Sequence, residues 1–424
     1  MTIANIHALF LECHAACTDT RTIAENDMFF ALKGDNFNGN AYAKQAIEQG
    51  AKYAIIDDPK FTIKNQTILV NNVLETLQQL ASYHRQHLKL PIIALTGSNG
   101  KTTTKELINA VLSQKYSTTA TVGNLNNHIG VPLTLLSMTN GTEIGIVEMG
   151  ANHQKEIEFL CGIAQPDYGY ITNFGKAHLE GFGGVEGVIK GKSELYNYLI
   201  AHHKTIFVNA NDAIQAEKTK QANRHTFGDA LQHVNINFIS AEPFVKLNYN
   251  NLEINSQLIG SYNFSNIAAA IAMGHYFKVD DEAIKHAIEN YTPNNNRSQI
   301  IKKGSLKIIL DAYNANPSSM RAALMNLEKQ QGLKMVILGD MFELGNYAAQ
   351  EHQAITDLAI SLNFDDIILI GENFFKCQTN ASKVKQFNTF NDFKALLDLS
   401  KVDNTTILIK GSRGMALERT LNCF

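Results

Sequence analysis

The chain has 424 residues, of which 45% are hydrophobic and 18% charged, which is typical of a globular protein with two or three domains. A formal net charge of −3 without a long basic run argues against nucleic acid as the main partner. Residues 1–11 lack signal-peptide features, no apolar run approaches the ~20 residues of a membrane span, and the scattered cysteines form no zinc or disulfide pattern, so we expect a cytoplasmic protein without a membrane span.

Residues 1–88 are predicted to form a small α/β domain. Its expected elements are a strand at Asp27–Leu32, a helix at Ala41–Gln49, a strand at Tyr53–Ile56 and a helix at Leu74–Leu88. Ahead of the first strand, Asp19-Thr20-Arg21 either binds an anionic or uracil-like ligand or forms an ordinary polar turn.

A glycine-rich turn, Gly97 to Thr104, follows an expected buried strand at Pro91–Leu95 and leads into a helix over Lys105–Leu112. Such a turn lets backbone N–H groups face a phosphate, and the helix N-terminus adds partial positive charge. Lys101 would neutralise phosphate oxygens, and the Thr102 hydroxyl suits a magnesium ion. The glycines are spaced more closely than in the common nucleotide loop, and alone the motif also fits a structural turn. With its flanking strand and helix, it predicts ATP binding.

Between residues 89 and 293 strands and helices alternate as in a parallel, doubly wound sheet, and several turns carry candidate chemistry. The polar segment Gly123–Gly130 suits a loop near a substrate. Glu148 ends the buried strand Ile144–Glu148 and is either a magnesium ligand or water-positioning group, or a cap of the next helix. His178 follows the strand Tyr168–Asn173, on the ligand side of a parallel sheet, although a lone histidine there is usually a surface residue.

Two further segments of this region have simple structural interpretations. Lys192 lies in Lys190–Leu195, early in a predicted helix, where a charged, solvated face is the default. Asn263 precedes the small-residue helix Ile267–Met273 and is suited to cap it.

The polar linker Pro293–Arg297 marks the second boundary, so residues 294–424 are expected to form the last domain. Its expected strands, each followed or ended by polar or glycine residues, are Leu306–Leu310, Met335–Leu338, Ile367–Ile370 and Thr406–Ile409. The absence of a Gly-x-Gly-x-x-Gly fingerprint gives no support to an NAD site. The sequence therefore predicts an α/β fold of three domains. A central doubly wound P-loop ATPase sheet is flanked by a small N-terminal α/β domain and a C-terminal Rossmann-like α/β domain.

Taken together, these segments resemble the Mur ligase family of ATP-dependent amide-forming enzymes over essentially the whole chain. The family's shortened phosphate loop is T-G-[ST]-N-G-K-T, which Thr96–Thr102 matches completely. Glu148 and His178 match an acid and a histidine that hold magnesium there, and Lys192 matches a lysine that is carbamylated and supports the second metal. The remaining matches are Asn263 and Asn266, in a G-x-[HY]-N-x-x-N segment near the adenine, and Arg297, which opens the third domain and contacts nucleotide phosphate.

Within the family, Asp311–Met320 and Leu338–Gly345 resemble segments of the members that add D-alanyl-D-alanine to UDP-N-acetylmuramoyl-tripeptide. Asp311–Met320 argues against the tripeptide-synthesising members and folylpolyglutamate synthetase. Asp19–Arg21 and Phe30–Gly34 resemble the UDP-sugar-binding region, although Asn38-Gly39-Asn40 replaces the usual Asp-Gly-His. The alternative from another class is a nucleotide-dependent switch or binding protein, which would need neither Lys192 nor His178 nor a separate substrate domain.

The resemblance implies ATP, two magnesium ions and a carbamylated Lys192 as cofactors, and a chain that acts as a monomer. Its substrates would be UDP-N-acetylmuramoyl-tripeptide, with lysine or diaminopimelate as third residue, and D-alanyl-D-alanine. The implied catalytic residues are Lys101, Glu148, His178, Lys192 and Arg297, and the implied metal ligands are Thr102, Glu148, His178 and Lys192. The implied nucleotide-binding residues are Gly97, Ser98, Asn99, Gly100, Lys101, Thr102, Thr103, Asn263, Asn266, Arg297 and Asp311. The implied substrate-binding residues are Thr20, Arg21, Lys33, Gly34, Asn124, Asn127, Asn314 and Asn316.

Overall fold

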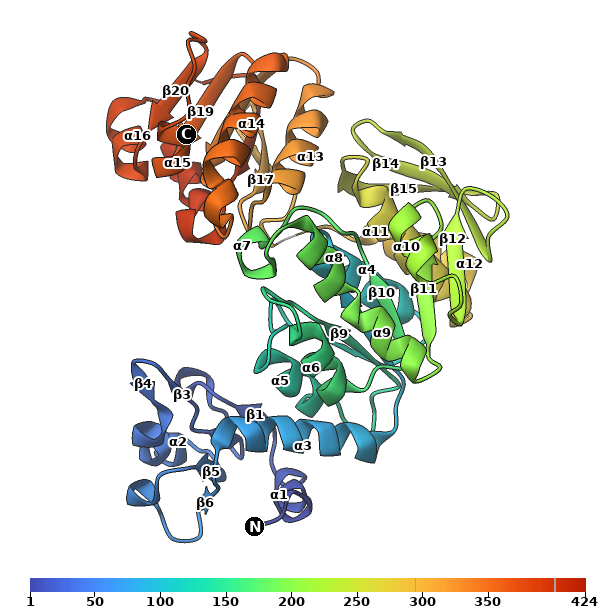
Figure 1. Ribbon diagram of the computed structural model, residues 1–424, viewed down its shortest axis with the longest axis vertical. Helices are drawn as coiled ribbons and strands as arrows, with labels where there is room; N and C mark the ends of the chain where they lie inside the picture. The colour runs from blue at the N-terminus through green and yellow to red at the C-terminus, as the bar shows by residue number, and fades with distance from the viewer. Residues whose placement is uncertain (294, 400–401) are drawn as a thin grey trace.

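The computed structural model describes residues 1–293, 295–399 and 402–424, which fold into three α/β domains that follow one another along the long axis of the molecule (Figure 1). The N-terminal domain (blue) lies at one end, the central domain (green and yellow) in the middle and the C-terminal domain (orange and red) at the other end. The predicted fold class is thereby confirmed. Position 294, where the third domain is predicted to begin, lies outside the described residues. No helix in the described ranges is long and apolar enough to cross a membrane.

The N-terminal domain is built on a parallel sheet in the order β1-β2-β5-β6. Its strands are β1 (Ala16–Cys17), β2 (Met28–Phe30), β5 (Tyr53–Ile56) and β6 (Thr67–Leu69), beside a separate hairpin of β3 (Lys33–Gly34) and β4 (Phe37–Asn38). Its helices are α1 (Ile3–Phe10), α2 (Ala43–Glu48) and α3 (Val73–Leu88), with 3-10 turns η1 (Thr20–Thr22), η2 (Gly39–Tyr42) and η3 (Pro59–Phe61). Asn72 caps the start of α3, and the buried face of this helix, which includes Leu77 and Leu80, packs on α1 and on the central domain.

The central domain contains a nine-stranded sheet in the order β15-β14-β13-β12-β11-β10-β7-β9-β8. Its strands are β7 (Ile92–Thr96), β8 (Thr118–Ala120), β9 (Ile144–Glu148), β10 (Tyr168–Ile171), β11 (Thr205–Asn209), β12 (Arg224–Gly228), β13 (Val234–Ala241), β14 (Phe244–Tyr249) and β15 (Leu252–Ile259). Only the strands from β7 to β13 pair in parallel as predicted, because β13, β14 and β15 form an antiparallel meander. The connections before and after β14 have two residues each, too few for the crossover that a parallel pair requires.

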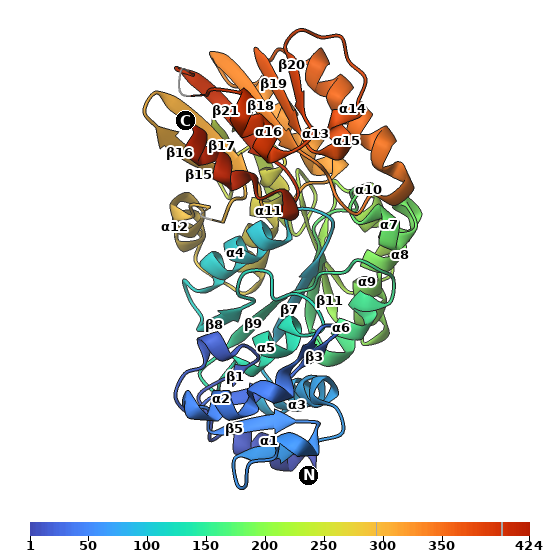
Figure 2. The same cartoon turned by 90° about the vertical axis from the view of Figure 1, so that its left-hand side faces the viewer.

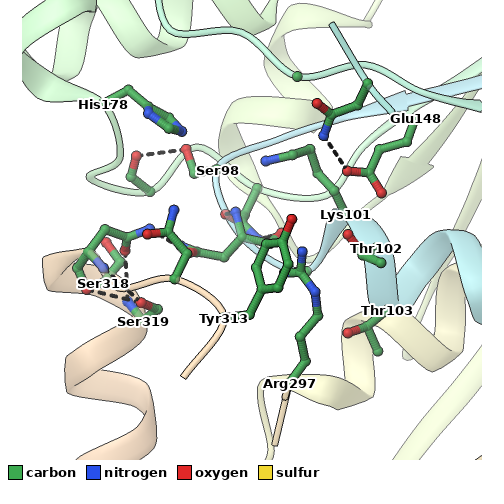
Figure 3. Close-up of a pocket in the computed structure, with 18 of the residues that line it drawn as sticks. Ser98, Lys101, Thr102, Thr103, Glu148, His178, Arg297, Tyr313, Ser318 and Ser319 are labelled. Carbon is green, nitrogen blue, oxygen red and sulfur yellow. Dashed lines mark hydrogen bonds between the residues drawn. The ribbon is translucent and has the colours of Figure 1, made fainter. Parts of the chain in front are cut away.

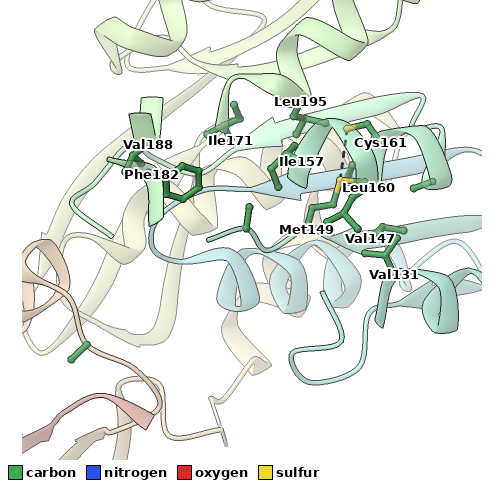
Figure 4. Close-up of a cluster of buried hydrophobic side chains, with 14 of the residues drawn as sticks. Val131, Val147, Met149, Ile157, Leu160, Cys161, Ile171, Phe182, Val188 and Leu195 are labelled. Carbon is green, nitrogen blue, oxygen red and sulfur yellow. Dashed lines mark hydrogen bonds between the residues drawn. The ribbon is translucent and has the colours of Figure 1, made fainter. Parts of the chain in front are cut away.

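Helices cover both faces of the central sheet, as the doubly wound prediction requires. The helices are α4 (Lys101–Leu112), α5 (Gly130–Leu136), α6 (Glu156–Ala164), α7 (Leu179–Phe182), α8 (Val185–Lys192), α9 (Glu194–Ala201), α10 (Ala213–Lys218), α11 (Asn263–Tyr276) and α12 (Asp281–Asn290). Helices α4 and α12 lie on one side of the sheet and α6, α8 and α9 on the other (Figure 2). Between the second face of the sheet and its helices lies a buried cluster that includes Met149, Leu160, Cys161 and Leu195 (Figure 4). Because β7 and β9 are buried along their whole length, their ends are fixed relative to one another.

The C-terminal domain has a six-stranded sheet in the order β16-β17-β21-β18-β19-β20, parallel except for the antiparallel edge strand β16. Its strands are β16 (Gln299–Lys303), β17 (Leu306–Asp311), β18 (Leu333–Gly339), β19 (Asp366–Ile370), β20 (Val384–Phe387) and β21 (Thr405–Lys410). Its helices are α13 (Pro317–Glu328), α14 (Ala348–Ser361), α15 (Glu372–Phe375) and α16 (Phe390–Leu396), with 3-10 turns η4 (Gly345–Tyr347), η5 (Arg413–Met415) and η6 (Leu417–Cys423). The four predicted strands are confirmed as β17, β18, β19 and β21.

Candidate nucleotide and substrate site

A cavity of about 840 Å³ lies where the central and C-terminal domains meet (Figure 3). Its central-domain wall includes the loop after β7, the end of β9 and the loop after β10, and its C-terminal-domain wall includes the end of β17 and the start of α13. Sixteen of the predicted site residues line it: Ser98, Asn99, Gly100, Lys101, Thr102, Thr103, Asn124, Asn127, Glu148, His178, Asn263, Asn266, Arg297, Asp311, Asn314 and Asn316. The carboxyl edge of the central sheet therefore faces a second domain across one space, the usual place for a ligand in open α/β folds.

The glycine-rich turn joins β7 directly to α4, which starts at Lys101 and not at Lys105 as predicted. Gly97 and Gly100 have φ values of 144° and 78°, a region that favours glycine. A Cβ atom on Gly100 would lie 2.5 Å from Asn266 Oδ1, so this position also excludes a side chain sterically. Lys101 Nζ donates to Gly97 O at 2.7 Å and folds the amine back over the turn. Burial lowers the pKa of Lys101, and nearby Glu148 partly opposes that effect.

Asn173, which the sequence did not single out as a site residue, holds the phosphate loop in shape. Its Oδ1 accepts from the Asn99 N–H at 3.1 Å, and its Nδ2 donates to Asn99 O at 3.0 Å. The Thr172 hydroxyl donates to the same carbonyl at 2.6 Å, and Ser98 Oγ donates to Gly175 O at 2.8 Å. The loop after β10 thus fixes the loop after β7, as their neighbouring places in the sheet allow.

Two asparagines at the start of α11 connect this helix to α4. Asn266 Oδ1 accepts from the Thr104 hydroxyl at 3.0 Å, and Asn266 Nδ2 donates to Asn263 Oδ1 at 2.8 Å. Asn263 Nδ2 donates back to Ile259 O at 2.8 Å, so Asn263 is the first residue of α11 and its side chain does not cap the helix. The suggested capping role of Asn263 is wrong, because its side-chain amide bonds to Asn266 and to the backbone of Ile259 and not to the free N–H groups at the start of α11.

Two buried oxygens beside Lys101 have no hydrogen-bond partner, namely Thr102 Oγ1 and Glu148 Oε2. The other carboxylate oxygen, Glu148 Oε1, accepts from Asn126 Nδ2 at 2.7 Å, which fixes the side chain (Figure 3). Unpaired buried oxygens cost free energy and suit a hard cation such as magnesium, which prefers oxygen ligands. The described part of the chain has no cluster of three or more His, Cys, Asp or Glu side chains suited to a metal. The unpaired Thr102 and Glu148 oxygens would therefore fit a magnesium ion.

His178 lines the cavity just before α7 and has a left-handed backbone, with φ 52°. Its Nδ1 is hydrogen-bonded to Glu343 Oε2 of the C-terminal domain. This hydrogen bond lowers the pKa of Glu343.

Lys192 is fully buried and is not among the cavity-lining residues. It is the last residue of α8, not an early helical residue as predicted, because the chain turns at Ser193 before α9. Its Nζ donates to Ala151 O at 3.0 Å and lies 5.0 Å from the centre of the Phe182 ring. Burial lowers the pKa of Lys192 well below the usual value. The prediction that Lys192 lies on a charged, solvated helix face is therefore wrong.

Charged groups of the C-terminal domain complete the far wall of the cavity. The Arg297 guanidinium stacks on Tyr313 at 3.7 Å, and Arg297 Nε has no hydrogen-bond partner (Figure 3). Asp311 Oδ2 accepts from buried Lys410 Nζ at 2.6 Å, and Asp311 Oδ1 accepts from the Ser298 N–H at 3.1 Å. Because Lys410 is paired with Asp311, the half-buried Arg297 is the positive group that this wall offers to a ligand.

The start of α13 contacts the phosphate loop directly. Asn316 caps this helix through a capping box with Ser319, and its Nδ2 donates to Asn99 Oδ1 at 2.7 Å. The Ser318 hydroxyl accepts from the Lys176 N–H at 2.9 Å. Asn314 Oδ1 accepts from the next backbone N–H, at Ala315. The C-terminal domain is therefore bonded both to the phosphate loop and to the loop after β10.

Comparison with known proteins identifies the family. Residues 12–85 match the Mur ligase family catalytic domain, residues 95–274 the Mur ligase middle domain and residues 296–413 the Mur ligase glutamate ligase domain. The UDP-N-acetylmuramoyl-tripeptide--D-alanyl-D-alanine ligase of Bacillus subtilis is 35% identical, with 98% of this chain and 94% of that protein covered. The chain belongs to the Mur ligase family.

Solved MurF structures have the same arrangement. MurF from Acinetobacter baumannii superposes with a TM-score of 0.88 at 31% identity, covering 99% of this chain and 98% of that one. MurF from Thermotoga maritima, solved in complex with ADP, gives a TM-score of 0.84 at 25% identity, with 98% and 97% covered. The chain is accordingly an ATP-dependent ligase.

The predicted substrate residues of the N-terminal domain do not line the cavity of this Mur ligase. Thr20 and Arg21 lie in the η1 turn, where Arg21 forms an ion pair with Asp19 at 2.6 Å. Lys33 Nζ lies 2.7 Å from Asp57 Oδ1, and Gly34 is exposed beside it.

The departure at Asn38 and Asn40 has a structural explanation. Fully buried Asn40 donates to Asp57 Oδ1 at 2.8 Å and accepts from the Asp57 N–H at 2.9 Å, while Asn38 Oδ1 accepts from Asn40 Nδ2. Asn40 thus holds the loop without a charge, and the sequence could not show that this position is buried.

Proposed function

We propose that this ligase joins D-alanyl-D-alanine to UDP-N-acetylmuramoyl-tripeptide, converts ATP to ADP and phosphate, and so produces the pentapeptide precursor of peptidoglycan. The observation that carries the proposal is the cavity in which the phosphate loop faces Arg297 and α13. Support comes from the Bacillus subtilis and Escherichia coli ligases of that name, which this chain matches over 94% and 92% of their lengths.

The proposal assigns one task to each domain. Residues 1–88 would bind the UDP-sugar end of the substrate through Thr20, Arg21, Lys33 and Gly34. Residues 89–293 would bind ATP, with Asn124 and Asn127 near the substrate, and Asn263 and Asn266 towards the adenine. Residues 294–424 would supply Asp311 for the ribose, and Asn314 and Asn316 in the loop facing adenine or dipeptide. The proposal also takes the chain to act as a monomer, and the need for ATP supports action in the cytoplasm.

Amide formation from a carboxylate is uphill in water, because the leaving group would be oxide. In the proposed reaction a terminal carboxylate oxygen of the tripeptide attacks the γ-phosphorus of ATP, and the bond to ADP breaks. The dipeptide amine then attacks the acyl carbon, loses its proton, and expels phosphate. Lys101 and Arg297 lie on opposite walls of the cavity and would neutralise charge on the transferred phosphoryl group (Figure 3).

Thr102 and Glu148 would hold the first magnesium ion, and their two unpartnered buried oxygens support this assignment. His178 and Lys192 would serve the second ion, which the family resemblance implies. When bound, such ions offset negative charge on phosphate and carboxylate oxygens and fix their orientation. For this chain the contribution is to hold Glu148 in place through Asn126.

Carbamylation of Lys192 is part of the proposal and rests on its buried amine. Carbon dioxide reacts with a neutral amine, and burial lowers the pKa of Lys192, which favours that form. With isotope-labelled bicarbonate, the wild type should give a carbamate carbon signal in NMR. Lys192→Ala should lose this signal and nearly all turnover. Full turnover in Lys192→Ala would reject the assignment.

The deciding experiment measures phosphate release from ATP and magnesium with UDP-N-acetylmuramoyl-tripeptide, with and without D-alanyl-D-alanine. Each tripeptide, with lysine or diaminopimelate, is tried, and the product mass is determined. Release that requires both substrates, with a gain of the dipeptide minus water, supports the proposal. Release that requires a single amino acid instead would assign the protein to a sister ligase, and release independent of any peptide would reject ligase activity on these substrates.

A further inference from the structure

One cavity-lining side chain of the central domain is held by a residue of the C-terminal domain. His178 is 18% exposed, and its Nδ1 is hydrogen-bonded to the carboxylate of Glu343, which is 165 residues away in the sequence. The pair joins α7 to the segment just before η4, and these two elements pack against one another.

The Glu343 side chain is presented from a well-anchored backbone. Its φ of 60° is a left-handed conformation that non-glycine residues rarely adopt. Glu343 O accepts from the Glu180 N–H at 3.3 Å. Immediately before it, the Phe342 N–H donates to Ser412 Oγ, and the Met341 N–H donates to His352 Nε2, each at 2.9 Å. The segment is therefore fixed both within its own domain and against the central domain.

The contact determines which nitrogen of His178 carries the proton. A carboxylate only accepts hydrogen bonds, so a neutral His178 in this contact bears its proton on Nδ1. The other nitrogen, Nε2, has no hydrogen-bond partner among the described residues and keeps its lone pair for a cavity ligand. Carboxylates that orient a histidine in this way fix its tautomer and the angle of its ring.

We propose that Glu343 is a positioning residue, which sets the tautomer and ring orientation of His178 from the neighbouring domain. Docking of the C-terminal domain is then required for a correctly prepared His178, in addition to bringing Arg297 to the cavity. The inference rests on the proposed function for the identity of the reaction, but the contact itself can be tested separately.

The first test uses nitrogen NMR of histidine-labelled protein, with the His178 signal assigned by its loss in His178→Ala. The wild type is expected to show the Nδ1–H tautomer at His178, and Glu343→Ala is expected to lose that preference. An unchanged His178 signal in Glu343→Ala would overturn the proposal. This readout needs no substrate, so it stands even if the proposed reaction is not observed.

The second test is a kinetic double-mutant cycle with a matched control. Glu343→Ala is expected to lower kcat by about tenfold to a hundredfold with little change in the KM for ATP, and Glu343→Gln, which keeps an oxygen acceptor, should retain more activity. In a His178→Ala background, Glu343→Ala should have no further effect.

The control is Glu351→Gln, since Glu351 also joins the two domains, through Lys176 at 2.6 Å, but does not contact His178. It is expected to change kcat less than threefold. An equal loss in Glu351→Gln, or a full further loss in the His178→Ala background, would show that Glu343 acts through docking alone and would overturn the proposal.

Discussion

At the scale of single residues, the site keeps polar groups that a stable core would not. The Thr102 hydroxyl and one Glu148 oxygen are buried without a partner, whereas the nearby Thr104 hydroxyl is paired with Asn266. An unpaired buried polar group costs about 1–3 kcal/mol, which a bound ligand can recover. Stability and activity should therefore respond in opposite directions to substitution at this site.

Thr102→Val tests this expectation, because valine has nearly the same shape and lacks the hydroxyl. We expect the free energy of unfolding without nucleotide to stay constant or rise by up to about 1 kcal/mol, while turnover of ATP falls at least about a hundredfold. Urea unfolding and phosphate release measure the two quantities.

Thr104→Val is the matched comparison on the same helix. It removes a hydroxyl that donates to Asn266 Oδ1 at 3.0 Å and leaves that acceptor unpaired, so it should lower the free energy of unfolding by about 1–2 kcal/mol. A clear loss of stability in Thr102→Val as well would contradict the interpretation of its hydroxyl as unpaired.

At the scale of elements, periodicity and strand-end chemistry predicted most of what positions the site. Strands β7, β9 and β17 were predicted within a residue at each end, because continuous apolar runs mark buried parallel strands. Three threonines obscured the start of α4, since threonine is a poor helix former and the phosphate loop sets that boundary. Likewise, α8 ends at Lys192, next to the turn at Ser193, and Lys192 is buried there. The local charge pattern alone assigns this lysine to the surface.

Helix α13 offers a test that separates capping from contact with the phosphate loop. Asn316→Ala removes both, and we expect it to lower the free energy of unfolding by about 1 kcal/mol. Asn316→Asp keeps a good cap but loses the Nδ2 donor to Asn99, so stability should be preserved while the KM for ATP rises several-fold.

Thr389→Ala provides the control, because Thr389 makes the same kind of capping box on α16 in the same domain. It should cost about as much stability as Asn316→Ala without raising the KM for ATP. If Asn316→Asp left the KM unchanged, the bond to Asn99 would have no role in nucleotide binding.

At the scale of the whole molecule, the contacts between domains were beyond sequence analysis. The bonds from Asn99 to Asn316 and from His178 to Glu343 join residues 217 and 165 positions apart, and no local pattern marks either partner. The sequence did place these residues in quoted motifs at the ends of strands or in neighbouring loops. What it lacked was the relative placement of the domains, which depends on packing between surfaces.

The joint between the N-terminal and central domains contains a buried histidine pair that should make it sensitive to acid. His7 Nε2 lies 3.0 Å from His84 Nδ1, and His84 Nε2 lies 2.9 Å from Met138 O of the central domain. The pKa of His7 is lowered from 6.5 to about 4, mainly by burial and to a smaller extent by the nearby His84 and His87.

Because the unfolded chain binds more protons between those two pKa values, stability is fully present above pH 6.5 and is lost as the pH falls towards 4. We expect the protection of amide hydrogens in α1 and α3 to weaken between pH 7 and pH 5 by about 1–2 kcal/mol, after correction for the intrinsic exchange rate.

His7→Gln keeps a polar partner for His84 and removes one titrating group, so it should reduce this dependence of protection on pH. The exposed His286→Gln, on α12, should leave it unchanged. Equal slopes in wild type and His7→Gln would show that the acid sensitivity of this joint arises elsewhere.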